Sequence, residues 1–132
     1  MVVNAGEVIP LFVVAMLAGK QPTVFGDGGQ SRDFTYVDNV VAGNLAAADT
    51  QSAAGGTYNV ACGSQFTLLD LIASINRVIG TDIQPAFEAA RVGDVRESLA
   101  DIAAARAGLG YEPVVGFDEG LQRSIEYYRT LM

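Results

Sequence analysis

The sequence predicts an α/β protein, because short segments rich in β-forming residues alternate with segments whose apolar residues recur at helical spacing. The chain has 132 residues, half of them hydrophobic, which suits one domain over residues 1–132 with a real core. Glycines lie between many of these segments, where they can end helices and form turns. No repeat, low-complexity segment or long linker interrupts the pattern.

The first part of the chain predicts two helices and two strands. The first helix spans Val8–Ala18, with Pro10 in the first turn, where a missing N–H is tolerated. Residues 23–25 form a short strand that leads into a glycine-rich loop, and residues 33–37 form a second strand. Asp38 or Asn39 can cap the next helix, which runs to about Asp49.

The remaining chain predicts two strands and three helices. A strand over residues 57–61 precedes a helix whose start is marked by Thr67 and Asp70, an N-terminal capping pattern, and whose end is marked by Gly80. A further strand covers residues 83–87. Asp101 can cap an alanine-rich helix to residue 108, and Asp118 opens a last helix with apolar residues on one side.

Composition excludes several classes of function. With 15 acidic and 8 basic residues the net charge is −7, which disfavours binding to nucleic acid or to an anionic membrane. Cys62 is the single cysteine and histidine is absent, so we expect no disulfide, no zinc site and no Cys–His nucleophile. The apolar stretch over residues 8–19 is shorter than the roughly 20 residues of a membrane span. We therefore expect a cytoplasmic protein.

Two loops each place one arginine beside glycines and an aspartate. The first runs from Gly26 to Arg32 and the second from Arg91 to Asp94. Fixed guanidinium groups served by flexible backbone suit an anionic ligand such as a pyrophosphate. Taken singly, the first loop also fits a simple turn, and Arg32 with Asp33 also fits a surface ion pair. The joint occurrence of the two loops favours a ligand site.

The usual signatures of catalysis and nucleotide binding are absent from the sequence. The glycine-rich loop is neither a P-loop, since no Gly-Lys-Ser/Thr follows, nor a dinucleotide fingerprint. No serine lies in a nucleophile elbow. Lys20 is the only lysine, and no tyrosine precedes it by four residues. The chain therefore looks like part of an enzyme.

The ordered motifs resemble a known family. Gly26-Asp27-Gly28-Gly29-Gln30-Ser31-Arg32-Asp33-Phe34, then Tyr58-Asn59-Val60, then Arg91-Val92-Gly93-Asp94, look like the C-terminal half of extended short-chain dehydrogenases. More narrowly, the series is similar to that of the NAD-dependent nucleotide-sugar epimerases and dehydratases of the UDP-glucose 4-epimerase type. The resemblance implies the C-terminal sugar-nucleotide-binding domain of an extended Rossmann-type epimerase, with the Rossmann NAD domain largely missing.

The resemblance implies six substrate-binding residues: Val8, Thr23, Phe25, Arg32, Arg91 and Asp94. Arg32 and Arg91 would bind the pyrophosphate of a UDP-sugar or dTDP-sugar from two sides. Asp94 would accept from a ribose hydroxyl. Thr23 and Phe25 would flank the pyrimidine, and Val8 would touch the nucleotide near the first helix. Forked donors, a carboxylate and an aromatic face suit these three parts of the ligand.

The resemblance also implies limits. The parent family uses NAD together with a Tyr-x-x-x-Lys pair, and this sequence contains neither the NAD loop nor that pair, so we expect no cofactor site, no catalytic residue and no metal in this chain. We expect a truncated chain that binds nucleotide sugars without turnover. One alternative is a non-catalytic oligomeric module or gene remnant, whose uncovered apolar faces drive homo-oligomerisation. Another is an enzyme assembled with a separate Rossmann chain.

Overall fold

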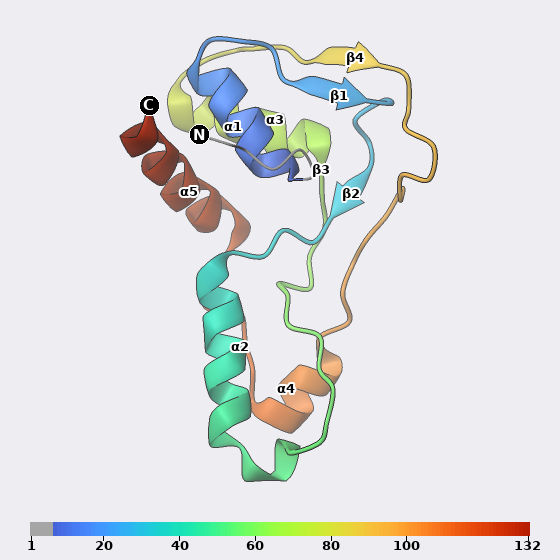
Figure 1. Ribbon diagram of the computed structural model, residues 1–132, viewed down its shortest axis with the longest axis vertical. Helices are drawn as coiled ribbons and strands as arrows, with labels where there is room; N and C mark the ends of the chain where they lie inside the picture. The colour runs from blue at the N-terminus through green and yellow to red at the C-terminus, as the bar shows by residue number, and fades with distance from the viewer. Residues whose placement is uncertain (1–6) are drawn as a thin grey trace. The chain divides into compact units, whose positions relative to one another are not determined.

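The computed structural model describes residues 7–132, whose contacts divide the chain into two compact units (Figure 1). The first unit contains the described part of Met1–Gln30 together with Thr67–Arg96 and Leu121–Met132. The second contains Ser31–Phe66 and Glu97–Gly120. The elements in chain order are α1 (Val8–Leu17), β1 (Thr23–Phe25), β2 (Ser31–Arg32), α2 (Val37–Asp49), the 3-10 helix η1 (Gln51–Ala53), β3 (Phe66–Thr67), α3 (Leu68–Ile79), β4 (Ala86–Glu88), α4 (Ala103–Leu109) and α5 (Phe117–Leu131).

This alternation confirms the predicted α/β class. The prediction of one domain over residues 1–132 stays a prediction, and its first six residues lie outside the described residues.

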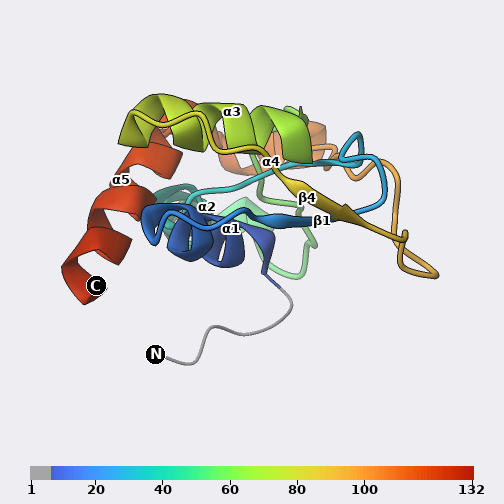
Figure 2. The same cartoon turned by 90° about the horizontal axis from the view of Figure 1, so that it is seen from above.

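The first unit is built on a parallel strand pair. β1 pairs with β4 in the register Thr23–Ala86, Val24–Phe87 and Phe25–Glu88. Helices α1 and α3 lie side by side next to this pair (Figures 1 and 2). The packed side chains are apolar and almost fully buried: Phe12, Val13 and Met16 from α1, Val24 from β1, and Leu68, Leu71, Ile72 and Ile75 from α3. Two helices on one short sheet thus form the core of this unit.

Local signals fix both ends of α3 as the sequence predicts. The Thr67 hydroxyl accepts from the Asp70 backbone N–H at 3.0 Å, and the Asp70 carboxylate accepts from the Thr67 N–H at 2.9 Å. This reciprocal pair satisfies two backbone donors that the helix leaves open. Gly80 ends the helix in the left-handed conformation, with φ of 74°. The predicted capping pattern is confirmed.

The second unit has its own small core. Residues from η1, α4 and the segments beside them bury apolar side chains together: Ala53, Ala61, Ile102, Ala105, Leu109 and Tyr111. The Tyr111 hydroxyl donates to the Ala61 carbonyl at 2.8 Å, which gives the one polar atom of this ring a partner. The predicted cap of α4 is shifted by one residue: Ile102 is the N-cap residue, and Asp101 before it accepts from the Ala103 N–H at 2.9 Å.

Two of the predicted strands are wrong. Residues 33–37 and 57–61 are not strands, and a short β2 occupies Ser31–Arg32 instead. Asp33 explains part of this difference, because its carboxylate accepts from the Cys62 N–H at 3.0 Å and from the Gly63 N–H at 2.8 Å. A side chain therefore ties these two segments together where a strand pair would use the backbone.

The strand predicted at 83–87 is shifted to Ala86–Glu88. The amide of Asn76 causes the shift, because its Oδ1 accepts from the Ile83 N–H at 2.9 Å and its Nδ2 donates to the Ile83 carbonyl at 2.9 Å. Both backbone groups of Ile83 are therefore used before the ladder begins.

The predicted cap of α2 is also corrected. Tyr36 is the N-cap residue and Asp38 lies inside the first turn. Asn39 is fully buried, and its amide binds backbone groups of Val114 and Val115. Asn39 therefore contributes to tertiary structure instead of capping the helix.

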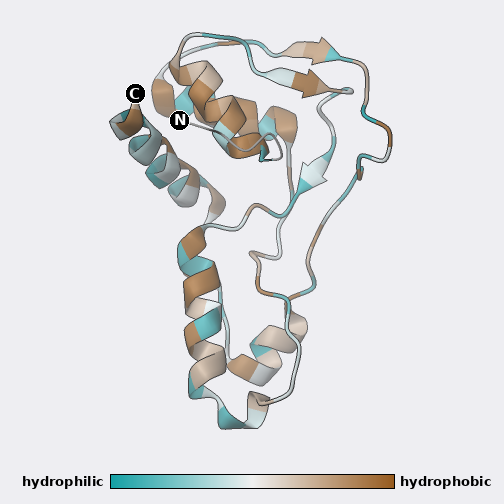
Figure 3. Ribbon diagram, in the orientation of Figure 1, coloured by the Kyte–Doolittle hydropathy of each residue, from teal (hydrophilic) through white to brown (hydrophobic). Residues whose placement is uncertain are grey.

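Apolar side chains remain exposed on α2, whereas α1 is apolar on most sides and largely packed (Figure 3). Val37, Val40, Val41 and Leu45 are 41–61% exposed. Their spacing of three, four and eight residues from Val37 places them on one face of the helix. No helix among the described residues has the length and apolarity to cross a membrane.

Candidate functional site

β1 places two of the predicted ligand residues on one face. Thr23 and Phe25 are two positions apart, so their side chains point to the same side of the strand, and Val24 points into the core with no exposed surface. Thr23 is exposed and Phe25 is half-buried. Val8 lies half-buried at the first position of α1. The strand thus presents a hydroxyl and an aromatic ring together.

The glycine-rich loop that follows β1 is held by helix α3. The Gly26 N–H donates to the Glu88 carbonyl at 2.9 Å, extending the ladder by one bond. Gly28 has φ of 79°, and a Cβ there would lie 2.7 Å from a methyl of Leu69, so this position requires glycine. The first turn of α3 donates from Leu69 N to the Gly28 carbonyl at 3.2 Å and from Leu68 N to the Gln30 carbonyl at 3.1 Å. The loop backbone is therefore fixed.

These bonds decide whether the backbone amides of this loop could bind a dinucleotide such as NAD. The Gly26 and Gly29 amides donate to the Glu88 carbonyl and to the Asp27 carboxylate, and the first-turn amides of α3 bind oxygens of this chain. A dinucleotide pyrophosphate is usually bound by such amides at a glycine loop and helix start. The described residues of this loop do not fit a dinucleotide.

Arg91 lies against the aromatic ring of the site. Its guanidinium carbon is 3.8 Å from the centroid of the Phe25 ring, which is the distance of a cation–π contact. Arg91 is exposed on the loop that follows β4. The structure therefore brings together the aromatic face and one of the two arginines that the sequence predicts.

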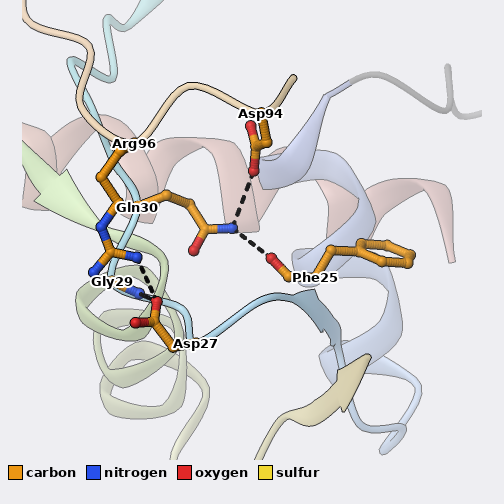
Figure 4. A network of polar contacts seen from close by, with 6 residues as sticks. All are labelled: Phe25, Asp27, Gly29, Gln30, Asp94 and Arg96. Atoms are coloured by element: carbon orange, nitrogen blue, oxygen red, sulfur yellow. Dashed lines mark hydrogen bonds and ion pairs between the residues drawn. The ribbon is translucent and has the colours of Figure 1, made fainter. Parts of the chain in front are cut away.

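Gln30 links the two loops (Figure 4). Its Nε2 donates to the Phe25 carbonyl at 2.8 Å and to the Asp94 Oδ2 at 3.3 Å. Gln30 is 6% exposed, whereas Asp94 is exposed. Asp94 is thus attached to the same strand end that carries Phe25, although the two residues are far apart in sequence.

A second link joins Asp27 and Arg96. The Arg96 Nη1 lies 2.6 Å from the Asp27 Oδ1, and the same carboxylate accepts from the Gly29 N–H at 2.9 Å. The Arg96 guanidinium, and after it the Gly29 N–H, hold the pKa of the Asp27 carboxyl below its usual 3.8. Because both side chains are more than 60% exposed, the pair contributes little to stability.

Arg32 belongs to the second unit, and its geometry is described within that unit. It is half-buried at the end of β2, and its Nη1 donates to the Ser31 carbonyl at 2.7 Å.

In the same unit the Cys62 Sγ lies 3.3 Å from the Asn39 Nδ2. Burial, and after it the negative charge of Asp33, raise the pKa of the Cys62 thiol. Cys62 is therefore a poor nucleophile at neutral pH.

The structure thus brings Phe25, Arg91 and Asp94 together at the end of β1 and the loop after β4, with Thr23 two positions earlier on the same face of the strand. Sequence reasoning missed the roles of Gln30, Asp27 and Arg96, which connect these residues. Gln30 lies within the quoted motif, but its partner is 64 positions away, so nothing local identifies its function.

Comparison with known proteins shows which family the chain resembles. Residues 4–61 match the NAD dependent epimerase/dehydratase family. Over 93% of its length the chain is 34% identical to UDP-glucose 4-epimerase of Mycolicibacterium smegmatis, and over 93% it is 31% identical to a putative UDP-glucose 4-epimerase of Methanocaldococcus jannaschii. The chain is therefore similar to members of the NAD-dependent epimerase/dehydratase family.

Solved structures agree with this assignment. The UDP-glucose 4-epimerase of Thermotoga maritima, solved with UDP-glucose, superposes with a TM-score of 0.88 at 36% identity, covering 95% of this chain and 40% of that one. The UDP-glucuronic acid 4-epimerase of Bacillus cereus, solved with UDP-glucuronic acid and NAD, gives a TM-score of 0.91 at 31% identity and covers 96% of this chain and 41% of that one.

The matches cover 93% of this chain, but the chain spans only 39% of the length of each of the two UDP-glucose 4-epimerase relatives. Its α/β fold is that of part of an extended short-chain dehydrogenase.

Proposed function

We propose that this chain is the nucleotide-sugar-binding portion of an NAD-dependent sugar epimerase or dehydratase and does not catalyse the reaction alone. The observation that carries the proposal is the cluster of Phe25, Arg91 and Asp94, which offers an aromatic face, a guanidinium and a carboxylate in one place. These three groups match the pyrimidine, the pyrophosphate and the ribose of a UDP-sugar or dTDP-sugar. The related solved structures that contain UDP-glucose and UDP-glucuronic acid support a UDP-sugar.

The contact between Arg91 and Phe25 adds a step to binding. A pyrimidine that stacks on the covered face of the Phe25 ring displaces the guanidinium, which then turns toward the phosphates. The displaced contact is worth only about 0.5–1 kcal/mol at an exposed site. A charged hydrogen bond to phosphate is worth about 1.5–3 kcal/mol, so the exchange favours the ligand. Arg32 supplies the second phosphate contact in this proposal, Thr23 borders the base through its backbone, and Val8 touches the nucleotide.

Substitution of each arginine tests this assignment. Arg32→Ala and Arg91→Ala should each weaken binding of UDP-glucose by about 1.5–3 kcal/mol in calorimetric titration. Arg129→Ala is the matched control, since it removes one positive charge from the last turn of α5, which carries none of the predicted ligand residues. Equal affinity in an arginine variant and in the unchanged chain would remove that arginine from the site.

A second candidate function is self-association through α2. Four apolar side chains, Val37, Val40, Val41 and Leu45, lie exposed on one face of this helix. An apolar stripe of this kind usually packs on another surface. We expect a homo-oligomer in light scattering that Leu45→Glu dissociates, whereas Val92→Glu, at a fully exposed loop position, leaves it intact. A monomer at high concentration would contradict this second candidate.

A further inference from the structure

Gln30 uses one nitrogen to hold two parts of the candidate site. Both protons of its Nε2 are engaged, one by the Phe25 carbonyl at 2.8 Å and one by the Asp94 Oδ2 at 3.3 Å. The residue is 6% exposed, so water competes little for these bonds. A buried amide in this geometry fixes the position of the exposed carboxylate relative to the strand end (Figure 4).

The backbone of Gln30 is itself fixed, because its carbonyl accepts from the Leu68 N–H at the start of α3. Helix α3 has a capping box at its start and a buried apolar face. The Gln30 side chain therefore connects Asp94 to a residue whose backbone is bonded to the start of this helix. The loop that carries Asp94 lies at the surface, since residues 89–97 are exposed throughout.

We infer that Gln30 is a positioning residue that holds the Asp94 carboxylate for the two hydroxyls of a nucleotide ribose. The inference rests on the proposed function, because Asp94 is the group that acts on the ligand. A carboxylate offers about four accepting positions, so it can accept from Gln30 and from a ribose hydroxyl at the same time. Gln30 thereby makes recognition of the ribose depend on the fold of α3, and it is not a catalytic residue.

The test compares UDP with 2′,3′-dideoxy-UDP, which lacks the diol. The unchanged chain should prefer UDP by about tenfold or more, the scale of one or two hydrogen bonds to a charged group. Gln30→Met, which keeps the size but removes both donors, should reduce this preference to less than about threefold while binding of dideoxy-UDP stays within about twofold. In an Asp94→Ala background, Gln30→Met should change the preference no further.

Gln21→Met is the matched control. Gln21 also donates from its amide to a backbone carbonyl, that of Gln84 at 3.0 Å, at the other end of the strand pair. This variant removes the same kind of bond without touching Asp94, so its preference for UDP should match that of the unchanged chain. An equal loss of affinity for both nucleotides in Gln30→Met would reveal a purely structural role and overturn the inference, as would an unchanged preference.

A measurement without ligand separates failure of this inference from failure of the proposed function. In hydrogen exchange, Gln30→Met should increase the opening of amides 91–94 at least about tenfold, whereas Gln21→Met should not. If the unchanged chain does not bind UDP, the proposed function and the ribose role both fall. If UDP binds but exchange and preference stay the same in Gln30→Met, only the positioning role falls.

Discussion

Asn39 offers the sharpest test of the fold, because one fully buried amide joins α2 to the segment before α5. Its Oδ1 accepts from the Val114 N–H at 2.7 Å and from the Val115 N–H at 2.9 Å, and its Nδ2 donates to the Val115 carbonyl at 2.8 Å. Asn39→Leu keeps the approximate volume and removes these three bonds together with the contact from Nδ2 to the Cys62 Sγ at 3.3 Å. Val114 is 63% exposed and its N–H can turn to water, whereas Val115 is 4% exposed.

The expected cost follows from the two buried groups of Val115. Leaving a buried donor or acceptor without a partner costs about 1–3 kcal/mol, so the pair costs about 2–6 kcal/mol. Burial of the leucine side chain offsets about 1.5–3 kcal/mol of this cost. We therefore expect Asn39→Leu to lower the free energy of unfolding by about 0.5–3 kcal/mol. Asn39→Asp keeps an acceptor for both N–H groups and should lose less.

Urea unfolding followed by circular dichroism measures these changes from the midpoint at constant slope. Asn44→Leu on the same helix is the control, and as an exposed position it should change stability by less than about 0.5 kcal/mol. If Asn39→Leu is no less stable than Asn44→Leu, the buried amide does not hold the segment before α5 and the reasoning is refuted.

Two further predictions concern the first unit. Leu71→Ala, at a position with no exposed surface in α3, should cost about 2–5 kcal/mol in urea unfolding. The control Leu99→Ala, at a 53% exposed position of the second unit, should cost less than about 1 kcal/mol. Equal losses would place Leu71 outside the core. Arg96→Ala should raise the pKa of Asp27 toward its usual value in carboxyl NMR titration. The pKa of Asp27 is lower in the folded chain than in the unfolded chain, so the ion pair stabilises the fold above pH about 4. This contribution is lost as the pH falls through the folded-state pKa of Asp27. An Asp27 pKa that is the same in Arg96→Ala and in the unchanged chain would contradict the assigned cause.

The features that the sequence predicts correctly are those whose causes are local. Helix α3 combines apolar residues at helical spacing with Thr67 and Asp70 at its start and Gly80 at its end, all within one segment. The structure gives Val8–Leu17 for the first helix and Phe117–Leu131 for the last, close to the predicted bounds. Periodicity and capping act within a few residues, so they can be read directly.

The features that the sequence did not predict depend on distant partners. Residues 57–61 have strand-like composition, but a strand also needs a neighbouring backbone, and the carboxylate of Asp33 takes that place at Cys62. Asn39 finds its partners 75 and 76 positions away. The bond from Gln30 to Asp94 spans 64 positions and likewise has no local signature. Side-chain bonds of this range become visible only in the folded chain.

The measurement that tests the central claim most directly is calorimetric titration of the purified chain with UDP-glucose, with NAD titrated in parallel. Binding of UDP-glucose without binding of NAD is the result expected for a nucleotide-sugar site that is already formed around Phe25, Arg91 and Asp94. Absence of UDP-glucose binding, or binding of NAD alone, would contradict the account.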